Sequence, residues 1–225
     1  MKSKLLSTII LLVLSFCFIG CNEVQRIDTV NDEGKEVMDL DYRDFDLVAG
    51  KMAESILTSG ILDNNGNKYV ISTGQILNLT TRRIDTPALR VKIEEEIINS
   101  GQAIMTSAVG GKNSLDPMVH NIRDVRDSDY GDEFKDDTIS GKGNLIAPDL
   151  NISGRIFHRE IVSHEKAELH ANDNSARWNS DKRIQREYYF QLMITDLSSG
   201  LRIWQKEILI GKRGNNKAAG YLKTR

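Results

Sequence analysis

The sequence predicts an α/β (α+β) domain with a long antiparallel hairpin toward its C-terminal end. Two observations support this fold class. Residues 67–109 contain a strand, a complete helix and a second strand in that order, and residues 184–210 alternate apolar and polar positions around a short turn. An export segment precedes the domain, because residues 1–20 combine a basic start with an uncharged apolar run.

The first folded element is expected to be a helix within residues 41–60. Its apolar residues recur at intervals of three and four positions, which places them on one buried face. Asp41 or Asp44 can cap the start of this helix, and Gly60 can end it. The expected buried face consists of Phe45, Val48, Ala49, Met52, Ala53, Ile56 and Leu57.

A strand, a helix and a strand are expected next. The stretch "NKYVISTGQILNLT" (residues 67–80) has the composition of a strand. In "DTPALRVKIEEEIINSG", Thr86 is the expected N-cap, Pro87 takes the first helical position and Gly101 follows the last one. The stretch "QAIMTSAV" (residues 102–109) predicts the second strand.

The middle of the chain, residues 110–142, is rich in glycine, aspartate, asparagine and arginine. Its apolar positions are sparse, so it predicts at most a short helix within residues 116–136. Strand-forming residues return in "LIAPDLNISGRIF" (residues 145–157).

The long hairpin is expected in the last third of the chain. A turn at "DLSSG" (residues 196–200) leads into "LRIWQKEILI" (residues 201–210), whose Trp204 can lie over the sheet. The strand before the turn has period 2, so alternate residues share a face. One face is expected to hold Ile184, Arg186, Tyr188, Phe190, Leu192 and Ile194, and the other Gln185, Glu187, Gln191 and Thr195.

The N-terminus predicts export and lipidation. Lys2 and Lys4 precede an apolar run of fifteen residues, 5–19, whereas a membrane-spanning helix needs about 20. The next residues complete "FIGC", which resembles a bacterial lipobox, so residues 1–20 are the expected signal peptide and Cys21 the lipidated first residue of the mature chain. The alternatives are an uncleaved anchor helix or a plain signal peptide.

Composition limits what the mature chain can do. Cys17 would be removed and Cys21 modified by lipid, so no thiol would remain for a disulfide, a metal site or a nucleophile. Without Lys2 and Lys4 the chain has 28 basic and 32 acidic residues, which is not the balance of a nucleic-acid-binding protein.

Flanking segments are expected on both sides of a globular domain at residues 42–211. Residues 21–41 are acidic and poor in large apolar groups, so we expect a flexible tether with a reach of about 25 Å. Residues 212–225 carry five basic groups and no acidic one, and we expect a basic flexible tail.

The sequence argues against an enzyme and against a metal or other cofactor. His158, His164 and His170 are six residues apart, and this spacing does not bring them together on one helix or one strand. The serine-containing stretches lack the nucleophile-elbow pattern, and "GKGN" lacks the spacing of a phosphate-binding loop.

One polar stretch, "ANDNSARWNSDKR", contains a large aromatic residue at the expected hairpin tip. Tryptophan and arginine are enriched at the energetic centres of interfaces. We therefore expect a partner-binding patch of Arg177, Trp178, Lys182 and Arg183. In the alternative, Trp178 folds back onto its own sheet.

Three stretches resemble the LpoB family of penicillin-binding-protein activator lipoproteins, over residues 42–214. They are "ILNLTTRRID" (76–85), "APDLNISGRI" (147–156) and "YYFQLMITDLSSGLRIWQKEILIGK" (188–212). The resemblance implies helices packed on a mixed sheet, as in the N-terminal domain of TolB. It also implies an outer-membrane lipoprotein without a catalytic centre that binds and activates a bifunctional peptidoglycan synthase.

The expected location is the outer membrane, with the domain facing the periplasm, because Asn22 follows the cysteine where an inner-membrane lipoprotein of enterobacteria would have aspartate. Two other functions stay open. Domains of this fold occur in curli-type export assemblies, so the chain could be a structural or secretion-associated envelope lipoprotein. An envelope enzyme is the third possibility, and the oligomeric state is not indicated.

Overall fold

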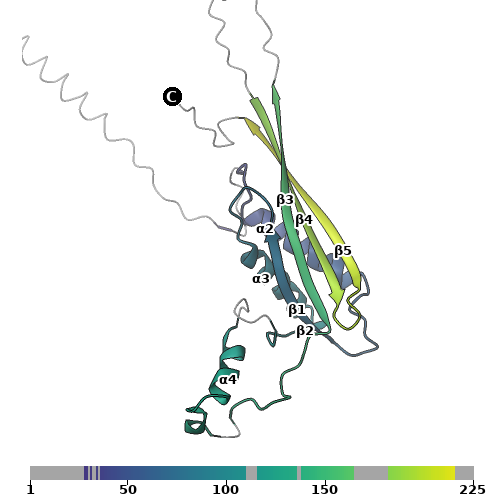
Figure 1. The fold of residues 1–225 in the computed structure, drawn as a ribbon. Coiled ribbons are helices and arrows are strands. Elements are labelled where there is room, and N and C mark those ends of the chain that lie inside the picture. Colours follow the sequence, from purple (N-terminus) through teal and green to yellow (C-terminus); the bar gives the residue numbers. More distant parts are fainter. Residues whose placement is uncertain are drawn as a thin grey trace, which may run out of the picture. The chain divides into compact units, whose positions relative to one another are not determined.

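The computed structural model describes residues 28, 29, 31, 34, 36–109, 116–135, 138–164 and 182–215 (Figure 1). The chain divides into two units, Met1–Lys35 and Glu36–Arg225. In the first unit, the side chain of Asn31 donates a hydrogen bond of 2.9 Å to Asp28. The second unit contains all the named helices and strands.

The second unit is an α+β domain, as the sequence predicts. Its elements, in chain order, are α2 (Tyr42–Thr58), β1 (Tyr69–Asn78), α3 (Thr86–Asn99), β2 (Ala103–Met105), α4 (Met118–Arg126), the 3-10 helix η3 (Gly131–Glu133), β3 (Leu150–His164), β4 (Lys182–Asp196) and β5 (Arg202–Asn215).

The five strands form one mixed sheet in the order β2-β1-β3-β4-β5. β1 is parallel to both β2 and β3, whereas β3, β4 and β5 are antiparallel to one another. The expected hairpin is therefore confirmed as β4–β5, and β3 extends it to three antiparallel strands. The mixed sheet is confirmed as well, while the likeness to the TolB domain stays a prediction.

α2 begins where the sequence predicts. Both candidate caps take part, because the Asp41 carboxylate accepts from the backbone N–H of Asp44 and the Asp44 carboxylate accepts from the N–H of Asp41. At the other end, Gly60 has φ 74°. This left-handed conformation commonly ends a helix, and glycine adopts it most easily.

α3 begins one residue earlier than expected. The N-cap is Asp85 and not Thr86, because the Asp85 carboxylate accepts a 3.1 Å hydrogen bond from the N–H of Ala88. A carboxylate is the stronger acceptor for a backbone N–H in the first turn, where it also faces the positive end of the helix dipole. Gly101, with φ 69°, follows the helix as predicted.

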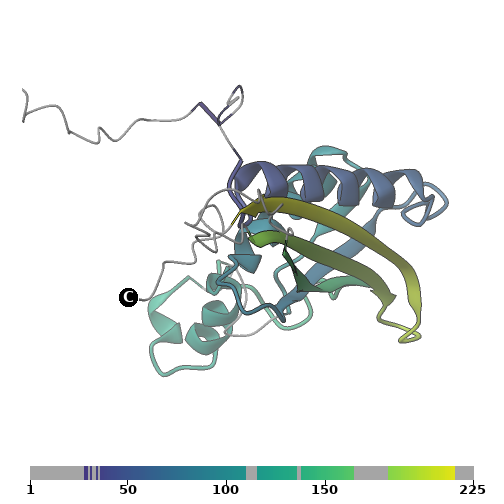
Figure 2. The same cartoon turned by 90° about the horizontal axis from the view of Figure 1, so that it is seen from above.

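The core lies between the sheet and the two long helices. α2 lies along one face of the curved sheet (Figure 2), with contacts to α3 and β5, and α3 contacts β1 and β2. The alternation predicted for β4 is confirmed, because all six residues of its expected inner face are buried. Trp204 is partly buried against this core, also as predicted.

The segment between β2 and β3 forms α4, the short helix expected in the middle of the chain. None of the residues of α4 is buried. Two arginines connect α4 to the backbone before and after it. Arg123 donates to the carbonyl of Ala108 at 2.7 Å, and Arg126 donates to the carbonyl of Ser140 at 3.2 Å.

The folded part extends beyond residues 42–211 at both ends. β5 continues to Asn215, and the side chain of Lys212 within it is buried. Before α2, Met38 is buried against Ile184 of β4. Ion pairs between distant segments, Arg186 with Asp39 and Lys212 with Asp44, hold both ends in place.

Among the residues that the structure describes, no helix is both long enough and apolar enough to cross a membrane.

Candidate interaction surface

The patch expected from the sequence is only partly within the described residues. Cys21, Arg177 and Trp178 lie outside them. Lys182 is the first residue of β4, and the next residue, Arg183, has an exposed side chain. Arg183 is in register with Ser163 of β3 and Asn215 of β5. The patch thus continues into the three-stranded part of the sheet.

The side of this three-stranded part that faces away from the core is here called the open face. It consists of the residues that alternate with the buried ones, because residues paired across strands share a face. The residues are Ser153, Arg155, Phe157, Arg159, Ile161 and Ser163 of β3; Arg183, Gln185, Glu187, Tyr189, Gln191, Met193 and Thr195 of β4; and Arg202, Gln205, Glu207, Leu209, Gly211 and Arg213 of β5.

An apolar row crosses the centre of the open face. Phe157, Tyr189 and Leu209 are direct partners on β3, β4 and β5. The rings of Phe157 and Tyr189 stack with their centroids 4.8 Å apart and their planes 1° from parallel. Leu209 is 52% exposed. The row therefore presents an apolar surface, and the stacked rings of Phe157 and Tyr189 fix each other's orientation.

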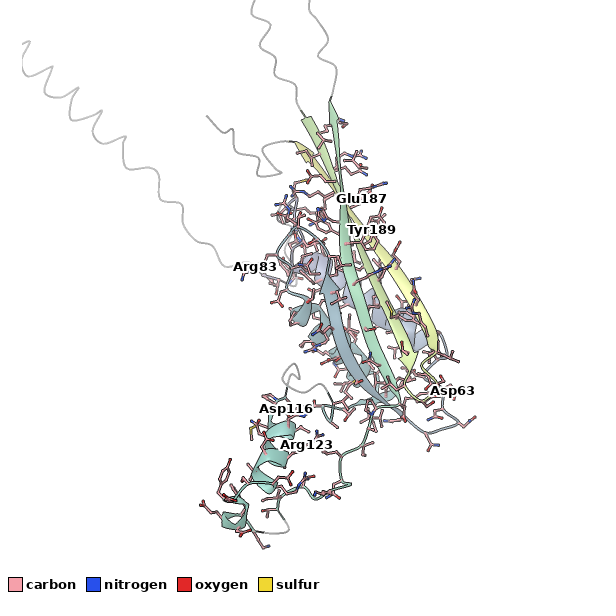
Figure 3. All side chains as sticks on the ribbon, viewed as in Figure 1. Asp63, Arg83, Asp116, Arg123, Glu187 and Tyr189 are labelled. Atoms are coloured by element: carbon pink, nitrogen blue, oxygen red, sulfur yellow. The ribbon has the colours of Figure 1, made fainter. Side chains whose placement is uncertain are left out.

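One polar row lies beside the apolar row and is centred on Glu187 (Figure 3). Glu187 is largely buried, with 8% of its surface exposed. Its carboxylate accepts hydrogen bonds from the Tyr189 hydroxyl at 2.8 Å and the Gln185 amide at 2.6 Å. It also pairs with Arg159 at 2.8 Å. These bonds, that of Tyr189 above all, hold the pKa of Glu187 below its usual range, so the carboxylate stays charged.

A second polar row lies on the other side of the apolar row. Arg155 donates to the Gln191 side-chain oxygen at 2.6 Å, and Gln191 donates to the Glu207 carboxylate at 2.5 Å. The Arg155 guanidinium also lies 5.9 Å from the centre of the Phe157 ring, a cation–π distance. The side chains of this row are thus oriented before any partner arrives.

Gly211 leaves a gap in the open face at its outer strand. It is the partner of Glu187 and lies between Leu209 and Arg213 along β5. A Cβ atom built there would have no neighbour within 4 Å. The backbone of β5 is therefore directly accessible at this point.

Positive charge predominates on the open face. The face has two carboxylates, Glu187 and Glu207, and five arginines, namely Arg155, Arg159, Arg183, Arg202 and Arg213. Within the described part of the chain, Arg155, Arg202 and Arg213 hydrogen-bond to glutamine side chains and form no ion pair. The chain as a whole has a net charge of −2.

On the core side of β4, a buried arginine connects three segments of the chain. Arg186 is 0% exposed. Its Nε donates to Glu160 of β3 and its Nη1 to Asp39, both at 2.8 Å. The Tyr188 hydroxyl donates to the same Asp39 oxygen at 3.0 Å. We call Asp39, Glu160, Arg186 and Tyr188 the arginine clamp.

Lys212 of β5 reinforces the arginine clamp from the neighbouring strand. Its ammonium group lies 2.6 Å from the Asp44 carboxylate and donates to the backbone carbonyl of Asp39 at 3.0 Å. Burial acts to raise the pKa of Asp41, but the hydrogen bond from Arg43 and the charge of Lys212 hold it below its usual range. The residues that lead into α2 are therefore fixed to the sheet by charge.

A cavity of about 450 Å³ lies beside the arginine clamp. Three of the charged groups on its wall are engaged, since Arg82 is 3.6 Å from Asp39 and Asp85 caps α3, and the fourth, Arg83, is exposed. It therefore offers no buried, unpartnered group that would select a ligand. The lining residues are Asp39, Leu40, Phe45, Arg82, Arg83, Ile84, Asp85 and Tyr188.

Of the three histidines at six-residue intervals, His158 is the one with described side-chain contacts. His158 stacks on Tyr188 with ring centroids 5.9 Å apart, and its Nε2 is 3.4 Å from the Thr81 hydroxyl. His164 ends β3, and His170 lies outside the described residues. In the described ranges, no three histidine, cysteine, aspartate or glutamate side chains are grouped as a metal site would require.

Sequence reasoning identified the polar side of β4 but not its role. The period-2 pattern placed Gln185, Glu187 and Gln191 together, and the structure confirms that they share the open face. The stacked pair of Phe157 and Tyr189 was missed, because it depends on the register between strands. The same pattern placed Arg186 among the buried apolar residues of β4. A charged residue at a buried position was the sequence feature that indicated a buried ion pair.

A family model and solved structures match the chain, and both comparisons include LpoB. The family model described as peptidoglycan-synthase activator LpoB matches residues 44–210. No curated protein matches the chain.

Several solved structures are similar to the chain. The C-terminal domain of LpoB from Escherichia coli matches 74% of this chain and 98% of its own, with 9% identity and a TM-score of 0.41. The NMR structure of Escherichia coli LpoB matches 87% of this chain and 79% of its own, with 10% identity and a TM-score of 0.34. Lipoprotein GNA1162 from Neisseria meningitidis matches 65% and 84%, with 10% identity and a TM-score of 0.31.

The arginine clamp should make stability depend on alkaline pH. Burial, and then the hydrogen bond to Asp39, raise the pKa of Tyr188 to about 12. An unfolded tyrosine titrates near pH ~10. The folded state holds the proton more tightly, so the stabilisation is complete below about pH 10 and is lost as the pH rises toward about 12. Urea unfolding should show a steeper loss across this range for wild type than for Tyr188→Phe.

Tyr130→Phe is the matched control, because the Tyr130 ring is exposed. It should reproduce the wild-type pH dependence. Equal slopes for wild type and Tyr188→Phe would show that the folded state does not raise the pKa of Tyr188 above its unfolded value.

Proposed function

Because the chain belongs to the LpoB family of peptidoglycan-synthase activators, we propose that it is an outer-membrane lipoprotein that binds and activates a bifunctional penicillin-binding protein. The family match carries this proposal, since residues 44–210 include nearly all of the folded unit. The family consists of regulatory activators, so the chain is not an enzyme, as the sequence predicts.

An activator without chemistry of its own must act by contact. The proposed mechanism is that the domain binds the synthase and favours its active conformation, since a ligand shifts an equilibrium only by its differential affinity for the two states. The open face supports this mechanism, because its side chains are ordered by bonds to one another. Pre-ordered side chains lose little further freedom on binding.

The docking surface is proposed to include Arg177, Trp178, Lys182 and Arg183. The position of Arg183 supports this, because its exposed side chain lies at the end of the open face. The patch and the open face would then act as one continuous surface.

The chain is proposed to be anchored through lipid on Cys21, after removal of residues 1–20, with the domain in the periplasm. A polar tether would follow and end near Glu36, where the folded unit begins. Fifteen flexible residues span about 20 Å. The synthase would therefore have to reach close to the outer membrane, and residues after Asn215 would form a short basic tail.

The proposed function is tested by adding the purified full-length chain, in detergent, to purified bifunctional peptidoglycan synthases of the same bacterium. The rate of glycan polymerisation should rise and saturate with concentration. If Trp178 is an interface hot spot, Trp178→Ala should raise the half-saturating concentration about thirtyfold, since loss of such a residue can cost about 2 kcal/mol. The thermal midpoint should not change.

No stimulation of any bifunctional synthase by wild type would contradict the proposed function. A Trp178→Ala chain that is less stable and still activates would instead assign Trp178 to the core, and would leave the function in place.

Lipidation is tested by Cys21→Ala in cells. The variant should accumulate as an unprocessed or soluble species, because the modified thiol and the cleavage site both depend on this residue. Cys17→Ala, within the expected signal peptide, is the matched control and should be processed as wild type. In density-gradient fractionation wild type should follow outer-membrane markers. A Cys21→Ala chain that still fractionates as a mature membrane protein would contradict the anchor.

A further inference from the structure

The open face combines three properties that together indicate what it binds. It has an apolar row at its centre, in which Leu209 is exposed and Phe157 and Tyr189 are half-buried. It has polar rows on both sides that are already hydrogen-bonded. It also has an excess of arginine over carboxylate. An apolar centre with a polar, charged surround is the general anatomy of a protein interface.

The charges of Arg155 and Arg213 on the open face are not neutralised by an ion pair within the described chain. Within the described residues, Glu187 pairs with Arg159. Arg155 and Arg213 instead hydrogen-bond to the neutral side chains of Gln191 and Gln185. Each guanidinium is thus held in place by a neutral acceptor and keeps its full charge toward solvent. A planar guanidinium fixed in this way is well suited to bind a carboxylate with two hydrogen bonds.

Negative charge is concentrated elsewhere in the domain. α3 contains three consecutive glutamates, Glu94–Glu96, and α2 and α3 together have six acidic and four basic residues. Both helices pack on the opposite side of the sheet from the open face. The domain therefore has a basic side and an acidic side although its overall charge is close to balanced, and charge complementarity selects one side for an acidic partner.

Access to the surface is open at its outer strand. At Gly211 nothing lies within 4 Å of the position of a Cβ atom. An incoming segment can therefore lie over the backbone of β5 at Gly211, between Leu209 and Arg213. From there it can reach the apolar row and Arg155.

We propose that the open face docks an acidic segment of the peptidoglycan synthase, with Arg155 and Arg213 binding its carboxylates and the row of Phe157, Tyr189 and Leu209 covering its apolar side. This inference rests on the proposed function and adds the chemistry of the contact. It assigns the recognition to side chains of β3, β4 and β5.

Gly211 has room for an added side chain, and because Glu187 is its cross-strand partner, the thermal midpoint of each variant is measured together with its affinity. Gly211→Glu places a carboxylate on the outer strand of the docking surface, between Leu209 and Arg213, and Gly211→Lys fills the same space with the opposite charge. Gly50 is the matched control, because it also has open space around its Cβ position and lies in α2 on the other side of the sheet. Neither glycine has a positive φ, so none of these changes strains the backbone.

The measurement is the affinity of the full-length chain, in detergent, for purified bifunctional synthases. Gly211→Glu should weaken binding about tenfold or more, because like charges then face each other in the interface. Gly211→Lys should weaken it less than Gly211→Glu, and Gly50→Glu should bind as wild type. The wild-type affinity should fall as salt rises, because exposed charges are screened.

The outcomes separate this inference from the proposed function. If wild type binds a synthase and Gly211→Glu binds equally well, the docking face is elsewhere and the proposed function stands. Equal losses in Gly211→Glu and Gly211→Lys, or a gain in Gly211→Glu, would overturn the acidic partner. If wild type binds no synthase, both fall. If wild type binds phosphatidylglycerol vesicles and Gly211→Glu does not, while synthase binding is unchanged, the face is a lipid-binding surface.

Discussion

The structure depends on one buried guanidinium, that of Arg186. A charged group removed from water is strongly destabilising unless it is paired, and removal of a partner from such a pair typically costs about 3–5 kcal/mol. Arg186 is paired with Glu160 on the neighbouring strand and with Asp39, 147 residues away in the chain. The segment before α2 is therefore part of the domain. Its carboxylates bind Arg186 of β4 and Lys212 of β5.

The two faces of the same three strands do different work as a result. On the core side, the six inward side chains of β4 from Ile184 to Ile194 are all used for packing or ion pairing. On the open face, hydrogen bonds between side chains order a surface that no described element covers. A rigid support that carries a pre-ordered surface is what a protein needs if it acts by contact alone. The fold thus accounts for an activator that has no reactive group.

The elements predicted from sequence were those governed by neighbouring residues. The Asp41 cap, the Gly60 stop and the alternation along β4 are all local patterns. Interactions between distant segments were missed. Asp39 belongs to an acidic stretch that predicts a tether, and nothing near it in sequence announces Arg186. The stacked Phe157 and Tyr189 likewise depend on strand register, which the sequence of one strand does not determine.

The central claim is that the open face, and not the helical side, contacts the synthase. The most direct measurement places a photoreactive amino acid at Leu209 on the open face or at Leu47 on α2, which are 52% and 44% exposed. Each variant is irradiated with the purified synthase, and the cross-linked peptides are identified by mass spectrometry. The account predicts cross-links from position 209 to an acidic segment of the synthase and none from position 47. Cross-links from position 47 alone would contradict it.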